Sequence, residues 1–166
     1  MDGLVRRRQR AFRYISGLMI AAPLMASAAT TVTVKVTVVA PPPCIINGDK
    51  AIDVDFGSEL LTTKIDGTNY IKTVDYTLEC KDNTSNAMKM QVQGSATTFD
   101  TSALQTNMKD LGVALKANGT ALAINNWLNF TYPDKPVLQA VPVKRAGSTL
   151  SGGDFVAAAT LMVAYQ

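Results

Sequence analysis

The residues that could do acid–base chemistry are four carboxylates that follow the first cysteine closely: Asp49, Asp53, Asp55 and Glu59. Two paired carboxylates can act as acid and base, or as acid and nucleophile, in a hydrolase. Asp53 and Asp55, however, alternate with three apolar residues, Ile52, Val54 and Phe56. That alternation is typical of a strand with one buried and one solvated face. We therefore interpret the carboxylates as the solvent face of a strand.

Other catalytic signals are absent from the sequence. The chain has no histidine, which removes the commonest general base and the commonest metal ligand. It has no Cys-x-x-Cys, phosphate-binding loop or Gly-x-Ser-x-Gly motif. Four aromatic residues could stack on a sugar ring, but core or interface packing is their commoner use: Tyr70, Tyr76, Trp127 and Tyr132. The sequence predicts no catalytic residue, no metal site and no cofactor, and thus no enzyme.

The N-terminus has the features of a secretory signal peptide. Five arginines lie within the first 13 residues, an apolar run covers residues 14–25, and small residues follow at 26–29. This order is typical of a signal peptide, and the run is shorter than the 20 or so residues of a membrane span. We predict a signal peptide over residues 1–28, export, and no stable membrane span.

Removal of that segment changes the charge of the chain. The whole chain has a formal charge of +3, but residues 1–28 contain five of its 16 basic residues and one of its 13 acidic residues. Residues 29–166 therefore have a net charge of −1. A nucleic-acid-binding protein needs a basic face, so we predict no nucleic-acid partner.

Cys44 and Cys80 are the only cysteines. Export to an oxidising compartment makes one disulfide between them the expected state, with two free buried thiols as the alternative. The chain-entropy model gives such a loop about 4 kcal/mol of stabilisation.

Alternating apolar residues over most of residues 29–166 predict seven to nine short strands. These runs cover residues 31–39, 52–57, 73–80, 88–92, 111–115, 121–124, 127–132, 137–143 and 155–165. Asn118-Gly119 is a hairpin-turn signal, and residues 101–108 are expected to form a short helical turn. Strands of this length separated by turn residues favour an all-β, immunoglobulin-like sandwich.

The two ends of residues 29–166 differ from an ordinary sandwich. Thr31 to Val39 is a strongly β-prone segment, and prolines at 41–43 separate it from the body. An unpaired strand there would promote aggregation unless it found a partner. In the last run one face carries Phe155, Ala157, Ala159, Leu161, Val163 and Tyr165, and no residues follow Gln166 to form the final strand of such a sandwich. We therefore expect an incomplete sandwich with an open groove beside its last strand. A spare strand and an empty groove give a heterologous, filament-forming contact.

Several motifs, in this order and spacing, resemble the subunits of chaperone–usher pili, above all the minor and adaptor subunits of type 1 and related fimbriae. They are V-T-V-K-V-T-V-V-A-P-P-P-C at 32–44, I-D-V-D-F-G at 52–57, D-Y-T-L-E-C at 75–80, L-G-V-A-L at 111–115 and the run from Gly152 to Tyr165. The resemblance spans nearly all of residues 29–166. It implies a donor-strand extension with a proline joint at 29–43 and a pilin domain at 44–166.

The resemblance also implies export through the periplasm to the cell surface, partners and residue roles. A periplasmic chaperone lends a strand to the groove, and an outer-membrane usher exchanges it for the extension of a neighbouring subunit. Donor residues would be Val32, Val34, Val36 and Val38. The groove and chaperone contacts would be Phe155, Ala157, Leu161, Val163, Tyr165 and Gln166, with the Gln166 carboxylate as the chaperone's anchor.

One position departs from the family pattern. Val36 stands where the family usually has glycine, a residue that permits close backbone approach. Either the neighbouring groove has a different pocket, or the pairing is shifted by one pair of residues. The sequence thus predicts a minor or adaptor subunit of an adhesive fimbria; the alternatives are the major pilin of the fibre and a single-domain, glycan-binding tip adhesin.

Overall fold

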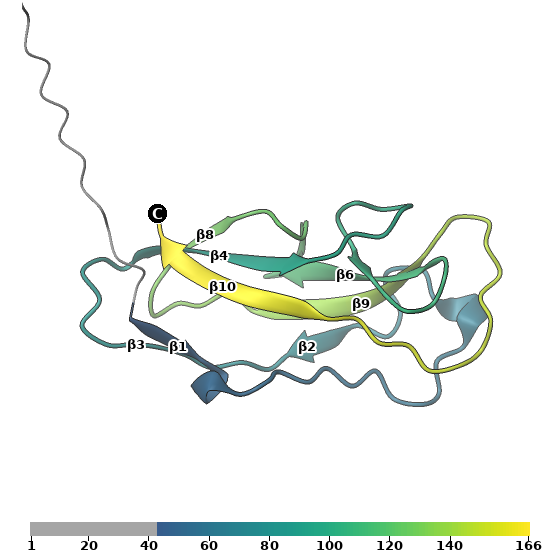
Figure 1. Ribbon diagram of the computed structural model, residues 1–166, viewed down its shortest axis with the longest axis horizontal. Helices are drawn as coiled ribbons and strands as arrows, with labels where there is room; N and C mark the ends of the chain where they lie inside the picture. The colour runs from purple at the N-terminus through teal and green to yellow at the C-terminus, as the bar shows by residue number, and fades with distance from the viewer. Residues whose placement is uncertain (1–42) are drawn as a thin grey trace, which may run out of the picture. The chain divides into compact units, whose positions relative to one another are not determined.

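A computed structural model describes residues 43–166, and Figure 1 shows their arrangement. The predicted signal peptide and the donor valines Val32, Val34, Val36 and Val38 lie outside these described residues. The described part is all-β with two short 3-10 turns, η1 (Asn47–Asp49) and η2 (Thr62–Lys64). Its strands are β1 (Cys44–Ile46), β2 (Lys72–Val74), β3 (Leu78–Cys80), β4 (Ala87–Gly94), β5 (Leu104–Gln105), β6 (Leu111–Ala117), β7 (Thr120–Leu122), β8 (Leu128–Thr131), β9 (Leu138–Lys144) and β10 (Ala159–Tyr165). The predicted all-β class is confirmed.

The strands form two main antiparallel sheets. One has the order β2-β9-β6-β5, with β7 paired to β6. The other has the order β10-β4-β8, and β1 and β3 form a separate two-stranded pair. Because consecutive strands such as β8, β9 and β10 alternate between the two main sheets, the chain is built as the predicted sandwich.

The core lies where the inward faces of these sheets meet. In β4 the inward residues are Met88, Met90 and Val92, of which both methionines are completely buried. They belong to one apolar cluster with Val113 and Leu115 of β6. The period-2 alternation of the sequence therefore translates directly into one buried face per strand.

The β6–β7 hairpin follows the turn signal. Asn118 and Gly119 both have positive φ, 50° and 80°, as the two central residues of a type I′ turn require. The side-chain Oδ1 of Asn118 also accepts a hydrogen bond from the backbone N–H of Val137 at 2.9 Å. This hydrogen bond links the turn to the residue that precedes β9.

Two expectations about local structure are wrong. Residues 101–108 contain the short strand β5 in place of a helical turn, because Leu104 pairs with Val113 of β6. The run from residue 73 to 80 is divided into β2 and β3, which pair with different strands, β9 and β1. In both cases long-range strand pairing overrides the local pattern.

Tyr76, between β2 and β3, gives the fold a measurable dependence on alkaline pH. Its hydroxyl donates to the Pro136 carbonyl at 2.6 Å, and burial raises the pKa of Tyr76 to about 12. A raised pKa means that this stabilisation is complete below pH 10 and is lost as pH rises towards 12. Replacement Tyr76→Phe should lower the free energy of unfolding by about 1–2 kcal/mol at neutral pH, because the buried carbonyl loses its donor.

Chemical denaturation of both chains between neutral pH and about pH 12 checks this prediction. The difference between wild type and Tyr76→Phe should shrink as the pH rises above 10, when ionisation of Tyr76 begins to oppose folding. A difference that stays constant across this range would show that the hydroxyl is not held in its neutral form by burial.

Candidate functional site: a groove beside the last strand

The free edge of β10 forms one wall of the candidate site. β10 pairs with β4 along its whole length, from Ala159 with Gly94 to Tyr165 with Met88. Within residues 43–166 its other edge has no strand partner. Of the inward-facing residues, Leu161 and Val163 are half-buried, whereas Ala159 is exposed. An inward alanine that remains exposed shows that nothing in the described chain covers this part of the sheet.

The opposite wall is the segment of residues 50–56. Ile52, Val54 and Phe56 are half-buried and pack against the core, while Asp53 and Asp55 are exposed. The predicted alternation is therefore present, but the segment has no strand assignment. A segment that runs along a sheet without backbone hydrogen bonds to a neighbouring strand is expected where that neighbouring strand is absent.

A groove with a volume of about 680 Å³ lies between these two walls. Phe56, of residues 50–56, and Phe155, which precedes β10 and extends its wall, are in aromatic contact, with ring centroids 5.7 Å apart. The deepest lining residues come from β4, β5, β6 and β9: Val92, Leu104, Val113, Leu115 and Ala140. Figure 1 shows β10 and the chain after β1 running in opposite directions. Most residues that line the groove are apolar, and β10 has a free edge beside it, which is the geometry that accepts one further strand.

Gly94 of β4 lies against two residues that line the groove. A Cβ atom at Gly94 would clash with Cδ2 of Leu104 and would lie 3.6 Å from Cβ of Ala159. These contacts also show that the Ala159 side chain lies on the inner face of the sheet. Glycine at 94 thus lets β4, β5 and β10 approach closely where the groove passes.

The predicted groove residues fall into two groups. Phe155, Ala157 and Leu161 line the groove. Val163 and Tyr165 instead pack against the core cluster near the end of β10. Residues of the groove floor, such as Leu104 and Val113, are not predicted as groove residues from the sequence, because only the pairing of distant strands brings them under β10.

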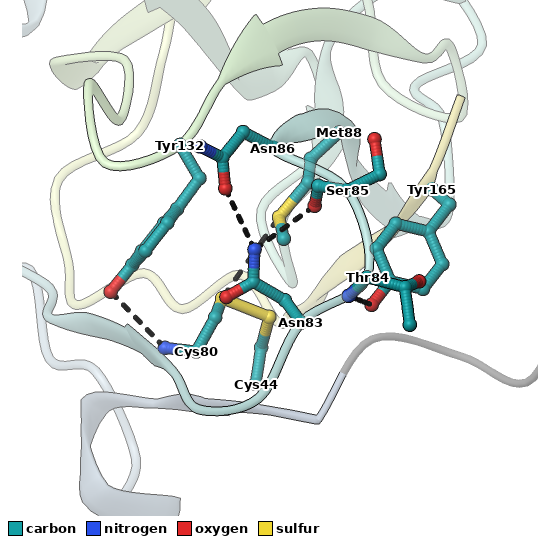
Figure 2. Close-up of a disulfide and its surroundings, with 9 residues drawn as sticks. All are labelled: Cys44, Cys80, Asn83, Thr84, Ser85, Asn86, Met88, Tyr132 and Tyr165. Atoms are coloured by element: carbon teal, nitrogen blue, oxygen red, sulfur yellow. Dashed lines mark hydrogen bonds between the residues drawn. A yellow bond between two sulfur atoms is a disulfide. The ribbon is translucent and has the colours of Figure 1, made fainter.

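The end of the chain is tied to the body. The side-chain Nε2 of Gln166 donates to the Met88 carbonyl at 2.8 Å and to the Phe130 carbonyl at 3.2 Å. The hydroxyl of Tyr165 accepts from the backbone N–H of Thr84 at 3.0 Å, as Figure 2 shows. These bonds hold the last residues of β10 over the ends of β4 and β8, so the groove wall has a fixed end.

Cys44 and Cys80 form a disulfide that joins β1 to β3, where the two residues are also direct partners in the ladder. Figure 2 shows the bond and its surroundings. The backbone N–H of Cys80 donates to the hydroxyl of Tyr132 at 3.3 Å. Pro43, the first described residue, immediately precedes this bond, so the disulfide fixes the point at which the N-terminal segment joins the body.

The residues considered above for metal binding or sugar stacking make contacts within the fold. Within residues 43–166 no cluster of histidine, cysteine or carboxylate side chains could hold a metal ion. Tyr70 accepts a hydrogen bond from the Leu61 N–H, and Trp127, 43% exposed, lies beside the Lys89 ammonium. Nor does any helix of the described residues have the length and apolar character of a membrane span.

Comparisons with known proteins agree with this geometry. The family model for fimbrial proteins matches residues 31–166. Two Escherichia coli K12 proteins described as uncharacterized and fimbrial-like are similar: YfcR is 38% identical, over 80% of this chain and 78% of its own, and YfcQ is 33% identical, over 92% and 98%. The chain therefore belongs to the fimbrial protein family.

Solved pilus subunits have the same fold. The P pilus adaptor subunit PapF superposes with a TM-score of 0.56 at 25% identity, covering 76% of this chain and 98% of PapF. The P pilus rod subunit PapA gives 0.54 at 22% identity, covering 82% and 100%. The predicted membership among chaperone–usher pilus subunits is confirmed, and with it the immunoglobulin-like fold. Membership of this family implies a structural role in the pilus and contact with other pilus subunits.

Proposed function

We propose that this fimbrial subunit is a minor or adaptor pilin that polymerises by donor-strand exchange. The observation that carries the proposal is the groove between β10 and residues 50–56, whose facing edges have no strand partner within residues 43–166. Residues 31–39 are β-prone in sequence and, when extended, would span about 28 Å, at roughly 3.3 Å per residue; their alternating valines match the mainly apolar lining of the groove. One subunit would thus supply the strand that completes the next.

A groove lined by apolar side chains is an aggregation hazard while it is empty. In the chaperone–usher family a periplasmic chaperone occupies such a groove first, and an outer-membrane usher replaces the chaperone strand by the extension of the neighbouring subunit; we propose the same order here. In this scheme residues 1–28 direct export and are removed, residues 29–43 are the donor extension with its joint, and residues 44–166 are the pilin body that enters the adhesive fimbria.

The likeness to the P pilus adaptor subunit PapF, at 25% identity and a TM-score of 0.56, supports a minor or adaptor role. The unusual Val36 at the family's glycine position is consistent with a donor strand addressed to a particular neighbour.

Blocking the groove tests the proposal. Ala159→Trp places an indole on the inner face of β10, where the donor strand would lie. Overpacking of this kind costs about 1–3 kcal/mol, so a labelled peptide of residues 29–43 should bind residues 29–166 about tenfold or more weakly by fluorescence anisotropy. Met162→Trp is the matched control, because Met162 lies on β10 but outside the groove lining. If both variants bind the peptide as wild type does, the groove is not the acceptor.

A further inference from the structure

One wall of the groove carries exposed acidic side chains. Asp53 and Asp55 point away from the core, on the face opposite Ile52 and Val54. Asp53 also lines the groove, together with Asp49 and the oppositely charged Lys50 at the start of the wall. The facing wall, residues 155–161, has no charged residue. Only one side of the groove therefore carries charge that an incoming strand could recognise.

The segment of residues 31–39 carries a single charge. Its even positions are all valine, and its odd positions are Thr31, Thr33, Lys35, Thr37 and Val39. Because successive side chains of a strand point to opposite faces, burying the even valines directs Lys35 outwards. Over residues 52–56 the wall has the same parity, with Ile52, Val54 and Phe56 inward and Asp53 and Asp55 outward.

Neighbouring strands of a sheet present side chains to the same face in pairs. A strand inserted beside residues 50–56 with its valines inward must therefore place Lys35 on the face that carries Asp53 and Asp55. A slip by one residue would bury the ammonium and expose the valines, which the apolar floor excludes. A slip by two residues keeps the valines inward. Registers that differ by two residues can therefore be distinguished only by other contacts, such as a pair of opposite charges.

On the basis of the proposed function, we infer that the groove accepts residues 31–39 of a second copy of this chain, with the ammonium of Lys35 paired to the carboxylate of Asp53 or Asp55. The valines supply the binding energy, and the ion pair selects among registers that differ by two residues. The chain thereby carries both halves of a charge-matched contact and can join to itself head to tail.

Charge-reversed peptides test this inference. Binding of the labelled peptide of residues 29–43 to residues 29–166 is compared with binding of its Lys35→Glu form, at about 0.02 M and about 0.5 M salt. The reversed peptide should bind about two- to five-fold more weakly at low salt, the range of exposed ion pairs, and the difference should shrink at high salt. The double variant Asp53→Lys, Asp55→Lys should invert the preference, whereas Asp134→Lys, an exposed acid outside the groove lining, should not.

The outcomes separate this inference from the proposed function. Equal binding of both peptides at low salt would overturn the ion pair and leave strand exchange intact. Binding of neither peptide would overturn both. A monomeric chain that binds peptide only after residues 29–39 are deleted would show that its own extension fills its groove, and would overturn pairing with a second copy.

Discussion

Deletion of residues 29–39 is expected to abolish joining of one subunit to the groove of another while the body remains folded. The deleted segment contributes four inward valines, whose burial is worth at most about 6–12 kcal/mol to the contact. Residues 44–166 make their own sheets and disulfide, so the body should keep its fold without this segment. Size-exclusion chromatography should therefore show no higher assemblies, with unchanged circular dichroism.

Two further variants make that result specific. Replacing Val32, Val34, Val36 and Val38 by threonine keeps the β-branched shape but adds buried hydroxyl groups, and should weaken joining almost as strongly as deletion. Replacing Thr33 and Thr37 by serine changes only outward positions and should leave joining intact. Normal assembly after deletion would mean that subunits meet through some other surface.

Removal of the disulfide should have the largest effect on the stability of the body. Cys44 and Cys80 are separated by 36 residues, and the loop-closure model assigns a link of this length about 4 kcal/mol. Without it β1 retains its short ladder with β3, and Pro43 retains the hydrogen bond that its carbonyl accepts from the Lys81 N–H at 3.2 Å. The double variant Cys44→Ser, Cys80→Ser should unfold at much lower denaturant concentration than wild type.

Denaturant unfolding with and without reductant measures this effect. The reduced wild type is the matched control for the serine variant, and the two should have similar midpoints, both well below that of the oxidised chain. A loss below about 1 kcal/mol in both would contradict the role of the disulfide as the main fastening of β1.

Much of the fold could be predicted because strand periodicity is a local property. The stripe of Met88, Met90 and Val92 and the Asn118-Gly119 turn follow from neighbouring residues, and both appear as predicted. The short helical turn at 101–108 was a wrong prediction, since β5 exists only through its pairing with β6. The division between β2 and β3 likewise depends on two different partners, which no local pattern specifies.

The candidate site was predictable at its walls and not at its floor. Phe155, Ala157 and Leu161 alternate along one segment, so their shared face could be inferred before the structure was known. Leu104 and Val113 lie far from them in sequence and reach the groove through the topology of two sheets. The exposed state of Ala159 is informative only in three dimensions, where it shows that the inner face of β10 is uncovered.

Mixing two complementary variants tests head-to-tail strand donation most directly. A chain without residues 29–39 keeps a groove but cannot donate, and an Ala159→Trp chain can donate but accepts poorly. By analytical ultracentrifugation the deleted chain alone should remain monomeric, and the Ala159→Trp chain alone should assemble only at concentrations about tenfold higher than wild type requires. Below that concentration an equimolar mixture should form heterodimers and nothing larger. Heterodimers that stop at two subunits are the result this account predicts; monomers alone in the mixture, or assemblies of the deleted chain by itself, would contradict it.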